Sequence, residues 1–186
     1  MANTGSQAGA KAAKTEMGEL EAMISESPTS EKVCLKLARI LSVHRSEIAL
    51  FRLEKGSLRF IFPVELRSAG VLPLSGTAVA ARTAATHTPL LSNSFMRVRH
   101  ASLFEAVRLS GNGEEDRNME QMPIQKIMSV PVASPDKTVR GVIQVSRKGL
   151  DAKGAGADFT GEDLKKLEKA AEILARMPFM QEGAEL

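Results

Sequence analysis

The sequence contains no tryptophan and no tyrosine, so phenylalanine is its only aromatic residue. It has a single cysteine, Cys34, and therefore cannot form an internal disulfide. No apolar run approaches the ~18 residues of a membrane-spanning helix. The first residues also lack the apolar core of a signal peptide. These absences predict a cytoplasmic protein with no membrane partner.

Charge of one sign is not concentrated in any part of the chain. The 25 basic and 22 acidic side chains leave a formal net charge of only +3 over 186 residues. A nucleic-acid-binding face gathers Lys and Arg in one patch, so we expect no nucleic-acid partner. A composition of 43% hydrophobic and 25% charged residues is typical of a globular domain with its own core.

The apolar spacing divides the chain into one domain between two short tails. The expected parts are a disordered tail over 1–14, an N-terminal helical segment over 15–44, a core over 45–150, a C-terminal helix over 160–177 and a tail over 181–186, with the domain itself spanning 15–180. Within the helical segment, Ser27-Pro28 predicts an N-cap followed by proline at the first helical position. Thr160, with Asp163 three residues later, predicts a capping box at the last helix.

The middle of the chain changes to the two-residue period of strands. "EIALFRLEKGSLRFIFPVE" predicts a hairpin that turns at Lys55-Gly56, and alternation places Phe60 and Phe62 on one face. Further on we expect a small-residue helix capped by Ser75, a short strand at "PLLSN", an amphipathic helix over 95–109 and a polar loop over 110–122.

"IQKIMSVPVASPDKTVRGVIQVSRKG", residues 124–149, predicts a second hairpin that is apolar on both faces. Such strands belong at the centre of a sheet that is covered on both sides. Strands grouped between terminal helices favour the α+β class, with an antiparallel sheet.

Four stretches resemble the GAF domain family, a small-molecule-binding regulatory module. They are "SGTAVAARTAATHTPLL", "IQKIMSVPV", "VRGVIQVSRK" and "FTGEDLKKLEKAAEILA". The resemblance spans about residues 30–178. It departs from the family pattern at His87, where the family usually has glycine. It also keeps only part of the family's cyclic-nucleotide signature, which disfavours a cyclic nucleotide as ligand.

The resemblance implies that the terminal helices cover one face of the sheet and that a ligand pocket lies on the other. The ligand-binding residues expected there are Phe60, Phe62, Ala80, Arg97, His100, Met128 and Gln144. Arg97 and His100 would form a cationic roof suited to an acidic small molecule. Lys148 and Asp163 match signature positions that imply a structural ion pair.

No catalytic constellation is visible in the sequence. The related enzyme free methionine-(R)-sulfoxide reductase needs two cysteines, whereas Cys34 stands alone on an apolar helical stripe. His44, His87 and His100 are too scattered for a recognisable metal site. We therefore expect no enzyme activity, and no cofactor is assigned.

The sequence thus predicts a sensory or regulatory domain in signal transduction that binds an unidentified small molecule and signals to a downstream protein. We expect a homodimer formed through the terminal helices. It would be held by the segment over 17–44 and by an exposed seam on the last helix, formed by Leu164, Leu167, Ala171 and Leu174. The alternative is a ligand-free module of the same fold, with a cavity filled by side chains, that serves only to dimerise or to dock a partner.

Overall fold

The computed structural model describes residues 15–95 and 122–181. After a helical stretch over 15–22, the elements are η1 (Met23–Glu26), α2 (Ser30–Ile40), η2 (Arg45–Glu47), β1 (Ile48–Glu54), β2 (Ser57–Phe62), η3 (Val64–Leu66), β3 (Val71–Pro73), α3 (Val79–Thr86), β4 (Leu90–Ser92), β5 (Ile124–Ala133), β6 (Val139–Lys148), α6 (Gly161–Leu174) and η5 (Pro178–Met180). None of the helices in these two ranges is long and apolar enough to cross a membrane.

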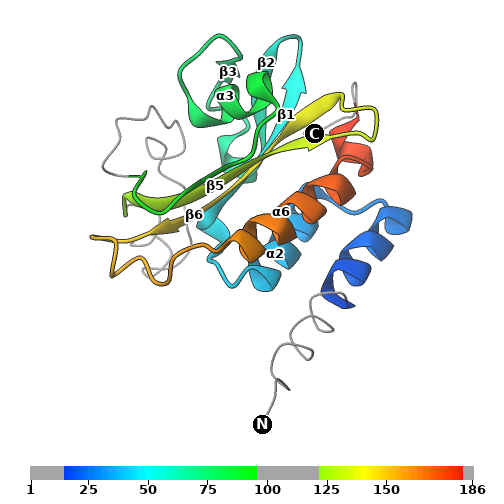
Figure 1. Ribbon diagram of the computed structural model, residues 1–186. Coiled ribbons are helices and arrows are strands. Elements are labelled where there is room, and N and C mark those ends of the chain that lie inside the picture. Colours follow the sequence, from blue (N-terminus) through cyan, green and yellow to red (C-terminus); the bar gives the residue numbers. More distant parts are fainter. Residues whose placement is uncertain (1–14, 96–121, 182–186) are drawn as a thin grey trace.

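The strands form one antiparallel sheet of six strands in the order β3-β2-β1-β6-β5-β4. Helices α2 and α6 cover one face, and the short helix α3 lies on the other (Figure 1). This confirms the predicted α+β class, the central position of the second hairpin and the location of the terminal helices.

The two hairpins turn where the sequence predicts. Lys55 and Gly56 both have positive φ, of 46° and 77°, as a tight two-residue connection requires. In the second hairpin, Pro131 faces Val142 of β6, while the pairing of β5 with β4 ends at Ser129. Proline has no N–H to donate and is tolerated where one side of a strand is unpaired.

The N-terminal segment is not one continuous helix. Ser27 adopts a left-handed conformation with φ 48°, which ends the first helical stretch. The N-cap of α2 is Thr29, whose side chain accepts the backbone N–H of Lys32 at 3.2 Å. The prediction of an N-cap at Ser27 is therefore wrong by two residues, because Pro28 precedes the cap instead of following it.

Helix α6 begins with the predicted capping box, in which Thr160 and Asp163 exchange side-chain and backbone hydrogen bonds. Its apolar stripe is not an exposed seam, because Leu167, Ala171 and Leu174 are buried in the core beneath the sheet. These side chains fill the interior of a single copy. The prediction of an exposed seam on the last helix is therefore wrong, while dimerisation and the part predicted for the 17–44 segment stay predictions.

Candidate functional site

The face of the sheet under α3 is the place where the sequence predicts a ligand. Helix α3 begins after Ala78, which makes no side-chain cap, so the prediction that Ser75 caps it is wrong. Its inward residues are small: Ala80 and Ala84 are buried against an apolar cluster that includes Phe60 and Phe95. Small side chains allow the helix to lie close to the strands.

A chain of three buried polar side chains crosses this face at the centre of the sheet. The hydroxyls of Thr83 in α3 and Ser129 in β5 lie 2.8 Å apart. The side-chain amide of Gln144 in β6 donates to the same Ser129 oxygen at 3.2 Å. Each of the three side chains is less than 5% exposed. Burial of polar groups is costly unless they are paired, and here each one has a hydrogen-bond partner.

The predicted ligand-binding residues divide between the two faces. Phe60, Ala80 and Gln144 belong to the α3 side. Phe62 and Met128 lie in the core under α2 and α6, so the structure does not bring them together with the other three.

The reason for the misplacement of Phe62 is a β-bulge. Leu50 of β1 faces Phe62, whereas the next residue of β1, Phe51, faces Phe60. One residue of β2 is thus left over, the alternation of side chains slips, and Phe60 and Phe62 point to opposite faces. The sequence rule of strict alternation cannot detect such a slip.

Arg97 and His100, the predicted cationic roof, lie outside the described residues. So do the helix predicted over 95–109, apart from its first residue, and the loop predicted over 110–122, apart from its last residue. Phe95, the last residue described before them, is buried in the same cluster as Ala80.

The signature positions near the end of β6 lie around Phe159. The guanidinium carbon of Arg147 lies 4.8 Å from the centre of the Phe159 ring, in a cation–π contact. The backbone N–H of Lys148 donates to the Glu47 carboxylate at 2.7 Å, and the Asp163 carboxylate accepts from Thr160. The Glu47 bond joins the end of β6 to η2, and the bonds between Thr160 and Asp163 cap α6. The ion pair between Lys148 and Asp163 stays a prediction.

Cys34 lies on the buried face of α2 and has no exposed surface. Burial strongly raises the pKa of its thiol, so the reactive thiolate is disfavoured. The position fits the structural role that the sequence predicts for it.

Two of the three histidines lie in the described ranges, and each lies at the end of a short helix. The ring of His44 accepts the Ser46 N–H at the start of η2. His87 ends α3 with φ 56°. In the described ranges 15–95 and 122–181, no three His, Cys, Asp or Glu side chains are grouped to hold a metal ion.

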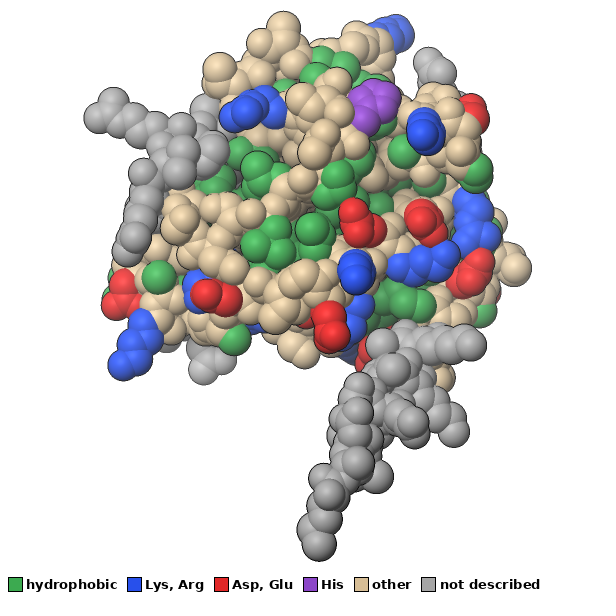
Figure 2. Space-filling model, viewed as in Figure 1, with side chains coloured by type: hydrophobic (Ala, Val, Ile, Leu, Met, Phe, Trp, Pro, Cys, Tyr) green, Lys and Arg blue, Asp and Glu red, His purple; other side chains and the backbone are tan. Residues whose placement is uncertain are grey.

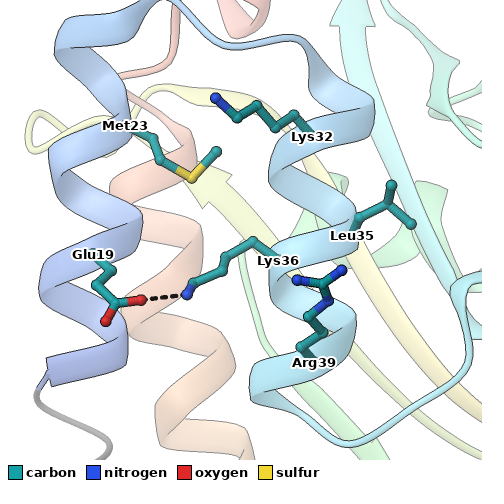
Figure 3. Close-up of a pocket in the computed structure, with 6 residues that line it drawn as sticks. All are labelled: Glu19, Met23, Lys32, Leu35, Lys36 and Arg39. Atoms are coloured by element: carbon teal, nitrogen blue, oxygen red, sulfur yellow. Dashed lines mark hydrogen bonds and ion pairs between the residues drawn. The ribbon is translucent and has the colours of Figure 1, made fainter.

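Among the surface concavities formed by described residues are two that no residue of α3 lines. One, of about 250 Å³, lies between the two hairpin turns and is lined by Leu53, Lys55, Gly56, Thr138, Val139, Arg140 and Met180. The other, of about 380 Å³, lies between the first helix and α2 (Figure 3). Neither concavity could be predicted from the sequence, because each is formed by residues from separate elements.

A scan against models of known protein families gives no match. A search of curated proteins likewise finds no relative. Solved structures do resemble this one. The GAF domain of an Acinetobacter phosphoenolpyruvate-protein phosphotransferase superposes with a TM-score of 0.60 at 13% identity, and the match covers 87% of this chain and 89% of that domain.

Two further structures extend the range of similar proteins. Residues 122 to 287 of a methyl-accepting chemotaxis protein match with a TM-score of 0.58 at 14% identity, over 88% of this chain and 99% of that one. Staphylococcus aureus fRMsr in complex with its substrate matches with a TM-score of 0.54 at 13% identity, and the match covers 89% of this chain and 94% of that one. Sequence motifs, sheet order and helix placement thus agree with these comparisons, and the chain has the fold of a GAF domain.

Proposed function

We propose that this chain is a non-catalytic sensory or regulatory domain that binds a small molecule between the sheet and α3. The observation that carries the proposal is the buried chain Thr83–Ser129–Gln144 beneath a helix of small residues. Pockets for small ligands combine apolar walls with a few placed polar groups. Phe60 and Ala80 supply apolar walls here, and Gln144 is the polar group best placed to change partners.

The absence of catalysis is part of the proposal. The one thiol, on Cys34, is buried and its pKa is raised. Solved structures of similar fold include domains from a phosphotransferase and a chemotaxis protein as well as fRMsr. A buried thiol fits the regulatory members of this set better than cysteine-dependent chemistry.

The sheet offers a route from the ligand face to the terminal helices. Ser129 faces α3, while its neighbours Met128 and Val130 face the core under α2 and α6, because successive strand residues point to opposite sides. A ligand that draws Gln144 or Thr83 away from Ser129 would shift β5 against the helix layer. Ligand binding would then change the population of two packings of the terminal helices.

The experiment is native mass spectrometry of the gently purified full chain, compared with its denatured mass. We expect an excess of a few hundred daltons that is lost on denaturation. Ala80→Met fills the proposed pocket and should abolish the excess. Ala85→Met places the same side chain at an exposed position of α3 and should retain it. A bound mass that survives Ala80→Met would place the ligand elsewhere.

One observation favours the alternative of a ligand-free docking or dimerisation module. The three polar side chains already satisfy one another, so the face is stable without a ligand. Under this alternative, native spectra show only the chain mass. Ala80→Met would then be strongly destabilising, since a packed interior has no room for the added atoms.

A further inference from the structure

The groove between the first helix and α2 is built from two helices of the terminal layer. The first helical stretch contributes Glu19 and η1 contributes Met23, while the rest of the lining comes from one side of α2 (Figure 3). Lys32, Leu35, Lys36 and Arg39 follow one another at helical spacing, so they form a continuous stripe along α2.

The charge of this lining is mainly positive. Three of its six residues are basic and only Glu19 is acidic. Glu19 pairs with Lys36, as the dashed line in Figure 3 marks, and Lys32 pairs with Glu26 at 3.2 Å, where both side chains are more than 60% exposed. Among residues 15–95 and 122–181, no carboxylate pairs with Arg39. The groove therefore retains unneutralised positive charge.

Apolar groups lie between these cations. The Met23 side chain extends into the space between the two helices in Figure 3. The other apolar residue of the lining, Leu35, is half-buried and extends from the side of α2 that faces away from Met23. Elsewhere on the terminal layer the exposed residues have mixed signs: α6 exposes Glu162, Lys165, Lys169 and Glu172. Figure 2 likewise shows acidic and basic side chains interspersed over the lower part of the molecule. The groove differs by combining an excess of basic over acidic residues with two apolar residues, Met23 and Leu35.

The geometry points to an acidic amphipathic helix of a partner protein as the occupant of this groove. From Lys32 to Arg39 the stripe spans two turns, or about 10 Å of α2. A partner helix with carboxylates at matching one-turn intervals would face Lys32, Lys36 and Arg39. Apolar side chains of the same partner helix would pack on Met23 and on Leu35, as in other helix-in-groove complexes. A second copy of this chain is a poorer match, because the exposed face of its α6 has mixed charge.

This inference concerns the face opposite to α3 and does not depend on a ligand there. A failed ligand experiment with Ala80→Met leaves the groove unchanged. A failed groove experiment likewise leaves the ligand proposal unchanged.

The test uses the full chain and a fluorescein-labelled 14-residue helical peptide with a leucine stripe flanked by glutamates. A matched peptide carries glutamine in place of every glutamate. We expect the glutamate peptide to bind at least tenfold more tightly in fluorescence anisotropy, and to lose that advantage in high salt. Arg39→Glu should weaken its binding at least tenfold. Lys165→Glu, which makes the same kind of charge reversal on the exposed face of α6, should not.

Equal binding of the two peptides, or equal effects of Arg39→Glu and Lys165→Glu, would overturn the inference. Circular dichroism must show that both variants are folded, and Leu35→Ser provides a second variant that leaves the charges in place. Analytical ultracentrifugation tests the second-copy occupant: a dimer that Arg39→Glu dissociates would overturn the inference. Preferential Arg39-dependent binding to vesicles with anionic phospholipid, without peptide binding, would also overturn it.

Discussion

The side-chain amide of Asn93 pairs with the backbone of Phe159 through two hydrogen bonds, although 66 residues separate them. The Asn93 Nδ2 donates to the Phe159 carbonyl at 3.0 Å, and the Phe159 N–H donates to the Asn93 Oδ1 at 2.9 Å. The amide thus replaces a backbone partner just after β4. It holds the residue before α6 in place, with the Phe159 ring buried under Arg147.

Asn93→Ala should lower the free energy of unfolding by about 1–3 kcal/mol, because it leaves the buried backbone groups of Phe159 without their partners. Chemical denaturation followed by circular dichroism measures this difference. Ser94→Ala is the control, since Ser94 is exposed and adjacent; its effect should stay within about 0.5 kcal/mol. Equal stability of the Asn93 variant and the parent would contradict a structural role for the amide pair.

Local signals predict much of this fold. The turn at Lys55-Gly56, the strand at Leu90–Ser92 and the capping box of Thr160 and Asp163 each depend on residues within a few positions of one another. These three features can therefore be predicted from short stretches of sequence. The grouping of apolar strands between terminal helices likewise predicts the layered architecture.

The candidate site was less predictable because it depends on contacts between distant residues. A bulge moves Phe62 to the opposite face from Phe60, and nothing in the residue types at that point signals it. The hydrogen bond between Thr83 and Ser129 joins residues 46 positions apart. The groove by α2 requires the break at Ser27, which folds the first helix back along α2.

His87 stands where the GAF pattern usually has glycine, and its φ of 56° is in the left-handed region. Residues with a Cβ lose roughly 1–2 kcal/mol in that region relative to the right-handed one. His87→Gly should therefore stabilise the protein by a few tenths to about 1 kcal/mol, because the flexibility of glycine in the unfolded chain offsets part of the gain.

Thermal or urea unfolding measures the effect of His87→Gly. His87→Ala is the matched control: it also removes the imidazole but keeps a Cβ, so it should not stabilise. If both variants shift stability equally, the imidazole and not the backbone conformation determines the result.

Glu54 links two arginines at the end of β1. Its carboxylate accepts from Arg52 at 2.6 and 2.8 Å and from Arg59 at 3.1 Å. Burial raises the pKa of Glu54, whereas the hydrogen bonds and charges of the two arginines lower it. Together the arginines outweigh burial, so the pKa lies below its ordinary value of 4.5. A lowered pKa means that the folded state favours the charged form.

The stabilisation from Glu54 should thus be complete above pH 4.5 and should disappear as the pH falls through the lowered folded-state pKa. Glu54→Gln should be less stable than the parent at pH 7, and this difference should shrink in acid. Urea denaturation from pH 7 down to pH 3 measures it. Glu162→Gln, at an exposed position in the first turn of α6, is the control variant. A constant difference between Glu54→Gln and the parent across this range would contradict the assignment.

Leu167→Asp distinguishes a core residue from an interface residue. Leu167 has no exposed surface and packs in the core between α6 and the sheet. An aspartate there would bury an unpaired charge, so we expect a loss of more than about 4 kcal/mol and an unfolded or expanded chain. Lys165→Asp introduces the same residue at an exposed position two residues earlier and should leave the fold intact. Circular dichroism and analytical ultracentrifugation read out folding and assembly separately. A Leu167→Asp protein that is folded and monomeric, beside a dimeric parent, would show that this stripe does form an interface between copies.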